Sequence, residues 1–344
     1  MTDPRIAVPT HHDHDAAAPC GCTCTPDAAC GTLVGRALVM GPVYDKIRRL
    51  AAKDVTVVVT GESGTGKDLV ARSLHTCSRR SAKPFVAINC AALPDTLLES
   101  ELFGHERGAF TGAYRSATGK LALADGGTLF LDEIGSMSPA CQAKILRVIE
   151  SHRFEPLGGH RSIDIDFRLV AATHEDLAAK AEHGAFRADL FHRLWVTHIH
   201  LPPLRERRED IPLLVEFFLQ QLEDKYCVRL SASAGLLVAM AAYPWPGNVR
   251  ELHNVVEGMV ALTDDGVLDE GALPDELRQA IDAAGSVASP PVLPERLRRY
   301  EQALLLEALQ RAGGNKTHAA RALGISRENF LKKLHKHEAA DPAP

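Results

Sequence analysis

Aromatic residues, long apolar runs and evenly spread cysteines are all scarce in this chain. Aromatics make up 5% of the 344 residues, so the core must be mostly aliphatic. No apolar run approaches the roughly 18 residues that a membrane helix needs, and residues 1–7 lack the apolar core of a secretory signal. We therefore expect a cytoplasmic protein without a membrane partner.

The placement of the eight cysteines argues against a disulfide scaffold. Four of them, Cys20, Cys22, Cys24 and Cys30, crowd near the start, and the others are scattered through segments that look like ordinary folded structure. A cytoplasmic chain keeps such thiols reduced. Hydrophobic residues at 45% and charged residues at 24% are typical of globular proteins, and the length suffices for two or three domains.

Composition divides the chain into five parts. Residues 1–31 form a flexible arm rich in His and Cys, whereas residues 32–204 alternate strand and helix patterns, which favours an α/β fold with a doubly wound parallel sheet. Strand signals then stop, so we expect residues 205–263 to be helical only. Residues 264–292 are interpreted as a linker because they hold seven acidic side chains against one arginine. Residues 293–340 are helical and basic.

A glycine-rich loop follows the first expected strand, residues 54–60; further strands are expected at 84–89, 127–132 and 167–173. The loop consists of Gly61, Glu62, Ser63, Gly64, Thr65, Gly66, Lys67 and Asp68. Such glycines let backbone N–H groups curl around phosphate oxygens, while the lysine adds a point charge. The general pattern has Ser or Thr where Asp68 stands. The alternative is a glycine-rich turn without a ligand, but the flanking strand and helix favour nucleotide binding.

A second motif supplies what hydrolysis needs beyond binding. The run 126–133 ends an expected buried strand with two carboxylates, Asp132 and Glu133. We predict that Asp132 holds Mg²⁺ and that Glu133 polarises the attacking water as general base. The alternative is an ordinary strand end, which the accompanying phosphate loop disfavours.

These motifs belong to a larger set. Over about residues 32–262, the chain resembles the AAA+ domain of sigma-54-dependent transcriptional activators, the bacterial enhancer-binding proteins. The matching segments are GESGTGKD, ELFGHERGAFTGA, GGTLFLDEIG, FRADLFHRL, LPPLRERREDI and WPGNVREL. The family usually has Glu where this chain has Asp68, and we expect that change to alter nucleotide affinity modestly.

The resemblance implies further residues at the nucleotide. Asn89 would pair with the catalytic Glu133, Thr173 and His174 would form the first sensor of the γ-phosphate, and Arg250 would be the second sensor, on the helical lid.

The resemblance also implies that Arg187 and Arg193 are arginine fingers that act in trans. Their spacing alone would favour surface ion pairs instead. Because fingers in trans need a neighbouring subunit, we expect a homo-oligomer, specifically the hexameric ring of the family.

The diagnostic segment of the class is Gly108, Ala109, Phe110, Thr111, Gly112 and Ala113. By resemblance it is the tip of a loop that contacts the sigma factor, with Phe110 and Thr111 at the contact. The residue chemistry agrees, because an aromatic side chain among small residues without periodic apolar partners is typical of a binding tip. The alternative is a buried turn.

Positive charge concentrates in residues 293–338, which hold ten Lys or Arg against five Glu. Expected helices at 293–312, 316–323 and 327–337 resemble the Fis-type helix-turn-helix that ends these activators. The residues expected at DNA are Thr317, Ser326, Arg327, Asn329, Lys332, Lys333 and Lys336. The alternative is a helical hairpin that serves dimerisation only.

Two segments are harder to interpret. Cys20, Cys22, Cys24 and Cys30, with nearby histidines, could bind Zn²⁺ or Cu⁺, although a disordered tail with incidental ligands is the alternative. With so short an arm, control would come from a regulatory protein acting in trans. In residues 205–210 three arginines lie beside three acidic residues, which we interpret as a solvated, self-paired turn without a chemical role.

The motifs together predict an ATP-dependent transcription activator. It would bind upstream DNA, hydrolyse ATP in a hexameric ring and remodel closed complexes of sigma-54 RNA polymerase into open ones. One alternative is an AAA+ ATPase that remodels another protein without a role in transcription, which the Gly108–Ala113 segment and the terminal module disfavour. Another is a nucleotide-binding repressor without turnover, which Glu133 and Asn89 disfavour.

Overall fold

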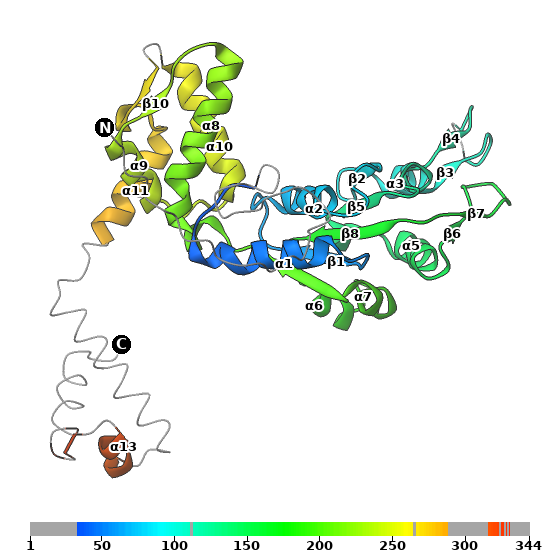
Figure 1. Ribbon diagram of the computed structural model, residues 1–344, viewed down its shortest axis with the longest axis horizontal. Coiled ribbons are helices and arrows are strands. Elements are labelled where there is room, and N and C mark those ends of the chain that lie inside the picture. Colours follow the sequence, from blue (N-terminus) through cyan, green and yellow to red (C-terminus); the bar gives the residue numbers. More distant parts are fainter. Residues whose placement is uncertain are drawn as a thin grey trace, which may run out of the picture. The chain divides into compact units, whose positions relative to one another are not determined.

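The computed structural model describes residues 33–110, 113–263, 266–287 and 316–322, together with Ile325, Ser326, Glu328 and Phe330. The chain forms two compact units, which divide after Asp275. In the described part of the chain, no helix has the length and apolarity needed to cross a membrane. The first unit holds the α/β region and the helical region that follows it (Figure 1).

Five parallel strands form the central sheet in the order β2-β5-β8-β1-β9. They are β1 (Val57–Thr60), β2 (Phe85–Asn89), β5 (Thr128–Asp132), β8 (Arg168–Thr173) and β9 (Thr197–His200). The first four lie within the runs predicted as strands, and the doubly wound α/β fold class is confirmed. β9 is not among the predicted strands because, at the sheet edge, it buries only Ile199 and shows no apolar run.

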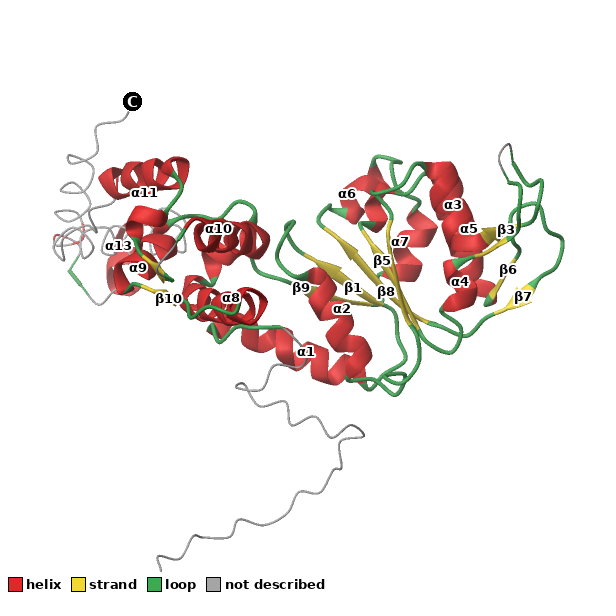
Figure 2. Cartoon of the chain, turned by 90° about the horizontal axis from the view of Figure 1, so that it is seen from above, coloured by secondary structure: helices red, strands yellow, loops and turns green. Residues whose placement is uncertain are grey.

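Helices cover both faces of the sheet (Figure 2). One face carries α1 (Gly41–Ala51) and α2 (Lys67–Thr76). The other carries α3 (Asp95–Phe103), α4 (Lys120–Leu123), α5 (Pro139–Ser151), α6 (Leu177–Glu182) and α7 (Ala188–Leu194). Alternation along β1 assigns the faces, since Val57 and Val59 belong to the core under α1 and α2 and Val58 to the opposite core.

Two short hairpins extend from the α/β region (Figure 1). β3 (Gly104–His105) pairs antiparallel with β4 (Ala117–Thr118), and β6 (Arg153–Phe154) pairs in the same way with β7 (Ile163–Asp164). An isolated bridge between His105 and Leu157 joins the two hairpins. The hairpin of β6 and β7 therefore supports the base of the loop between β3 and β4.

The helical region consists mainly of α8 (Ile211–Tyr226), α9 (Ala234–Ala242) and α10 (Asn248–Leu262). It is not helical only, because β10 (Ser231–Ala232) pairs in parallel with β11 (Val267–Leu268). β11 and α11 (Asp275–Val287) lie in the stretch that we interpret as a linker from its acidic composition. Leu268 and Leu277 are buried there, so spaced leucines between the acidic residues give this stretch regular structure.

The described cysteines do not all follow the expectation of reduced thiols. Cys90, Cys141 and Cys227 are free, whereas Cys77 is disulfide-bonded. Burial raises the pKa of Cys141 to about 12 and raises that of Cys90 as well. Both buried thiols therefore stay protonated at neutral pH and are poor nucleophiles and metal ligands.

Candidate functional site: the phosphate loop and its surroundings

The phosphate loop connects the end of β1 to the start of α2 and needs glycine where other backbone presses on it. Gly64 has a φ of +78°, and a Cβ there would stand 2.2 Å from the carbonyl oxygen of Gly247. At Gly61, a Cβ would stand 2.7 Å from the carbonyl oxygen of Leu201. Asp68 is exposed in the first turn of α2, where the helix dipole favours a negative charge.

Carbonyl oxygens of the loop accept hydrogen bonds from side chains and backbone around it. Lys67 Nζ donates to those of Gly61 and Glu62, at 3.0 and 3.1 Å. Asn248 Nδ2 donates to that of Ser63 at 3.0 Å. Since these carbonyls are bonded within the protein, the loop can direct its N–H groups to an anion, so the residues present fit a phosphate group.

The ends of β2 and β5 meet beside the loop. Asn89 Nδ2 donates to Asp132 Oδ2 at 3.2 Å, and Asn89 Oδ1 accepts from the N–H groups of Ala91 and Ala92. The expected pairing of Asn89 with Glu133 is therefore not the one in this structure. The reason is register, because Asn89 lies directly opposite Asp132 in the sheet.

Glu133 is held by His174, just after the end of β8, and not by Asn89. Its Oε2 lies 2.6 Å from His174 Nδ1 and accepts from the His174 N–H at 3.3 Å. Its Oε1 lies 3.7 Å from Lys67 Nζ. Glu133 also has a φ of +51°, an uncommon conformation that clusters at functional sites. The structure thus brings the expected general base next to the loop lysine.

The electrostatics at Asp132 fit a cation. Burial, and then the charge of Glu133, raise the pKa of the Asp132 carboxyl, while Lys67 acts in the opposite direction. Neighbouring carboxylates repel each other, and their oxygens are the ligands that Mg²⁺ prefers. The donor set at this strand end therefore fits the predicted magnesium site.

The two expected sensors approach from different elements. Thr173 ends β8, is buried, and accepts the Glu175 N–H on its Oγ1 at 3.0 Å. Arg250, in the first turn of α10, donates from Nη1 to Ser63 Oγ at 3.0 Å. The lid arginine therefore contacts the phosphate loop directly. The hydroxyl of Thr173 instead bonds to the backbone two residues further along, at Glu175.

The charged run 205–210 is the functional feature that the sequence analysis missed. Arg205 forms two hydrogen bonds to Glu62, at 2.7 and 2.8 Å, which lower the pKa of that carboxyl. Arg207 is 1% exposed and donates from Nη2 to the carbonyl oxygen of Thr65 at 3.0 Å. The interpretation as a solvated, self-paired turn is therefore wrong, because two of the arginines hold the phosphate loop.

The same run also binds the segment before α1. Asp210 is buried and accepts the N–H groups of Arg36 and Ala37, at 2.6 and 2.8 Å. A sequence signal for the burial of Arg207 exists, because Arg207 lies three residues after Leu204 and four before Ile211, both of which are buried. At helical spacing that is the position of a core residue.

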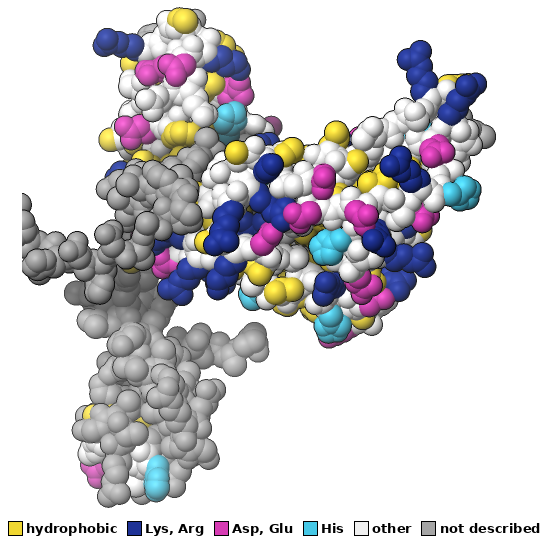
Figure 3. Space-filling model, turned by 45° about the vertical axis from the view of Figure 1, so that its right-hand side comes forward, with side chains coloured by type: hydrophobic (Ala, Val, Ile, Leu, Met, Phe, Trp, Pro, Cys, Tyr) yellow, Lys and Arg dark blue, Asp and Glu magenta, His cyan; other side chains and the backbone are white. Residues whose placement is uncertain are grey.

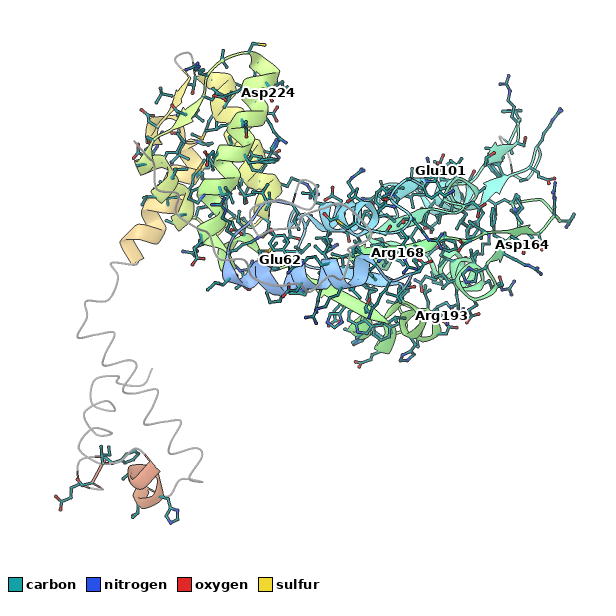
Figure 4. All side chains as sticks on the ribbon, viewed as in Figure 1. Glu62, Glu101, Asp164, Arg168, Arg193 and Asp224 are labelled. Atoms are coloured by element: carbon teal, nitrogen blue, oxygen red, sulfur yellow. The ribbon has the colours of Figure 1, made fainter. Side chains whose placement is uncertain are left out.

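Arg187 and Arg193 flank α7, at its N-cap and in its last turn. Both are exposed, and the Arg187 side chain bonds to Asp189 at 2.7 and 3.0 Å. Figure 4 shows Arg193 on its helix. Among the described residues, no hydrogen bond or ion pair joins either arginine to the phosphate loop of its own chain.

The loop between β3 and β4 presents Phe110 to solvent. Its ring is 40% exposed and meets the ring of His105 edge-on, with centroids 4.9 Å apart. The N–H of Gly108 donates to the carbonyl oxygen of Ala113 at 2.9 Å, which closes the loop. Thr111 and Gly112 lie outside the described residues. The alternative of a buried turn is not what the described part of this loop shows.

Cationic and aromatic side chains surround this loop. Arg107, Arg115 and Arg161 are exposed, and Tyr114 is 85% exposed. Figure 3 shows Lys and Arg side chains, in dark blue, at the free end of the extension. The loop is thus a protruding surface of mixed aromatic and positive character.

The expected helix-turn-helix is described in part. α13 (Lys316–Ala322) coincides with its expected second helix, and the N–H of Phe330 donates to the carbonyl oxygen of Ser326 at 2.9 Å. Ala320 and Phe330 are buried, whereas Thr317 and Ser326 are exposed. The other residues expected at DNA lie outside the described residues: Arg327, Asn329, Lys332, Lys333 and Lys336.

The expected arm site also lies outside the described residues, which include none of Cys20, Cys22, Cys24 and Cys30. Within the described ranges, no group of three or more His, Cys, Asp or Glu is placed to hold a metal ion. The arm site therefore stays a prediction from the sequence.

The fold and site together define a class of protein. A parallel sheet with a phosphate loop, carboxylates at a strand end and a helical lid that touches the loop make an AAA+ ATPase. Residues 33–200 match the sigma-54 interaction domain, residues 205–290 the AAA+ ATPase lid domain, and residues 296–337 the bacterial regulatory proteins of the Fis family. The chain belongs to the sigma-54-dependent transcriptional regulators, with an ATPase domain and a DNA-binding helix-turn-helix.

Individual relatives cover most of the chain. The regulatory protein AtoC of Escherichia coli (strain K12) is 44% identical over 320 residues, which span 91% of this chain and 69% of AtoC. The transcriptional regulatory protein ZraR of Klebsiella oxytoca is 46% identical over 311 residues, spanning 90% and 70%. The crystal structure of NtrX from Brucella abortus in complex with ATP is 37% identical, with a TM-score of 0.66, over 89% of this chain and 69% of NtrX.

Proposed function

We propose that the chain forms a hexameric ring, hydrolyses ATP with Mg²⁺, and thereby converts closed complexes of sigma-54 RNA polymerase into open ones. The observation that carries this proposal is the connection between the carboxylates and the exposed loop. Asn89 ends β2, bonds to Asp132, and is followed by α3, which leads into β3 and the Phe110 loop. A helix is stiff enough to transmit a displacement from the carboxylates to that loop.

Each residue at the nucleotide has a separate task in this reaction. Lys67 supplies positive charge at the phosphates, and Arg250 brings a second charge from the lid. Asp132 would hold Mg²⁺, which supplies charge neutralisation at the phosphate oxygens when bound. Glu133 takes the proton of the attacking water. In this structure His174 holds Oε2 of Glu133, whereas the other oxygen, Oε1, lies 3.7 Å from Lys67 Nζ.

The ring is needed because Arg187 and Arg193 are exposed on α7 and would complete the site of a neighbouring subunit. Sedimentation of the chain with a non-hydrolysable ATP analogue tests this. We expect a hexamer, and a chain that stays monomeric or dimeric would contradict it.

The Fis-type module would carry the ring to double-stranded DNA upstream of the promoter, and these partners imply a cytoplasmic protein. A regulatory protein acting in trans would supply control. Deleting residues 292–344 should abolish sequence-specific DNA binding and retain ATP hydrolysis; retention of specific binding would contradict the assignment.

Promoter melting in a purified system with sigma-54 holoenzyme and ATP tests the whole proposal. Glu133→Gln should lower the rate of hydrolysis at least about 100-fold and abolish melting. Phe110→Ala should lower melting per ATP hydrolysed by about tenfold or more, because it removes the exposed contact.

Tyr114→Ala is the matched control for Phe110→Ala, since Tyr114 is an even more exposed aromatic residue on the same extension. It should keep melting within about twofold of the unmodified chain. Hydrolysis without melting of any sigma-54 promoter would favour the alternative, an ATPase that remodels another protein.

A further inference from the structure

The turn behind Glu133 is joined to the backbone of Arg187 inside one chain. Glu133 is followed by a short helix, η2 (Ile134–Ser136), which leads to Met137. Gln142 on α5 is fully buried, and its Nε2 donates to the carbonyl oxygen of Met137 at 2.8 Å. Its Oε1 accepts the N–H of Arg187 at 2.8 Å. One amide thus links the hydrolysis site to the arginine expected to serve the next subunit.

Lys180 makes a second connection between the same two segments. Its Nζ donates to the carbonyl oxygen of Gly135 in η2 at 3.0 Å, and it pairs with Glu175. The carbonyl oxygen of Lys180 accepts the N–H of Phe186 at 3.1 Å, directly before Arg187. Two independent hydrogen-bonded routes therefore run from the turn behind Glu133 to the N-cap of α7.

Burial makes the Gln142 link sensitive to substitution. An amide in the core uses both its donor and its acceptor here, so an apolar replacement leaves the Met137 carbonyl and the Arg187 N–H without a partner. The position of the Arg187 backbone determines where its exposed guanidinium lies. A displacement of about 1 Å at such a point can lower a catalytic rate about 100-fold.

We propose that Gln142 is a positioning residue that couples the two sites each subunit serves. It places Arg187 for the neighbouring site according to the position of the turn behind its own Glu133. When that turn moves, the Met137 carbonyl moves the amide, and the amide moves the Arg187 backbone. This inference rests on the proposed function, because it requires that Arg187 acts in trans.

The first test is steady-state hydrolysis by Gln142→Met. The kcat should fall by about 10- to 100-fold, while KM for ATP stays within about twofold, because the loop residues of each chain are intact. Ser138→Ala is the matched control: it removes the N-cap of the same helix, where Ser138 Oγ accepts the Cys141 N–H at 3.4 Å, and leaves the link intact. Its kcat should stay near that of the unmodified chain. An equal fall in both variants would overturn the proposal.

The second test mixes chains. Gln142→Met chains are titrated with Lys67→Ala chains, which have a defective loop but an intact Gln142 and Arg187; Arg187→Ala with Lys67→Ala is the reference mixture. Turnover per Gln142→Met chain should rise several-fold in the mixture, as in the reference. Recovery in the reference only would overturn the role of Gln142 and leave trans action standing. No recovery in either mixture would overturn trans action itself, and this inference with it.

Discussion

The two ends of the central sheet differ in how their charged side chains are compensated by neighbouring groups. Where the strands begin, Arg168 is 2% exposed and donates to the carbonyl oxygens of Leu50, Ala51 and Leu74, at 2.8, 3.1 and 3.1 Å (Figure 4). These carbonyls lie at the C-terminal ends of α1 and α2, where a cation also suits the helix dipole. Where the strands end, Asp132 and Glu133 lie side by side, and the pKa of Asp132 is raised.

The same strands thus have a stabilised end and a reactive end. At Arg168, the two terminal nitrogens of a buried guanidinium bond to three backbone carbonyls and so hold two helices to the sheet. At Asp132 and Glu133, two like charges lie close together beside the phosphate loop, an arrangement that a bound cation would stabilise. Substitutions at the first end should therefore change stability, and substitutions at the second should change the handling of ATP.

The largest effect on stability is expected for Arg168→Met. It removes the donor of three carbonyl oxygens in the core, so the free energy of unfolding should fall by about 3 kcal/mol or more. Urea denaturation without nucleotide measures this. The matched control is Arg153→Met, because Arg153 and its partner Asp164 are both exposed. That loss should be about 1 kcal/mol or less, and equal losses would remove the contrast between a buried and a surface arginine.

A smaller effect, divided between stability and binding, is expected at Asn248. It is buried, has a φ of +55°, and donates to both Glu62 and Ser63. Asn248→Ala and Asn248→Gly should both raise the Kd of a fluorescent ATP analogue by about tenfold, because the loop loses these hydrogen bonds. Asn248→Ala should also be about 1 kcal/mol less stable than Asn248→Gly, since only glycine adopts this φ without strain. Unchanged affinity in both would show that the lid does not position the loop.

The smallest effect concerns His75, whose Nδ1 lies 2.9 Å from Thr128 Oγ1 at the stabilised end. Burial, and then the charge of Arg168, lower the pKa of the ring. The unfolded chain gains a proton near pH 6.5, and the folded chain does so only at lower pH, so stability is lost as pH falls between the two values. Between pH 7 and pH 5 the unmodified chain should lose about 1 kcal/mol more than His75→Asn. Urea denaturation at both pH values measures this. An equal loss of unfolding free energy in the unmodified chain and in His75→Asn would contradict it.

Much of the fold could be predicted because aliphatic runs and glycine-rich turns act locally. β1 was predictable from its consecutive valines, whereas β9 was not, because an edge strand buries little. The partner of Glu133 could not be predicted from motif order. Strand register puts Asn89 opposite Asp132, and the end of β8 brings His174 to Glu133.

The residues alone indicated the chemistry. A phosphate loop indicates nucleotide binding, two carboxylates at the end of an apolar run indicate hydrolysis, and a cationic terminal module indicates DNA binding. Only the tertiary structure decided which segments enclose the buried charges. Arg205, Arg207 and Arg208 are alike in the chain, yet Arg207 is enclosed between the phosphate loop and the segment before α1. The spacing of Arg207 from Leu204 and Ile211 indicates a core position, but nothing in the run of charges says which segments will enclose it. The physical reason is that burial depends on what distant segments cover.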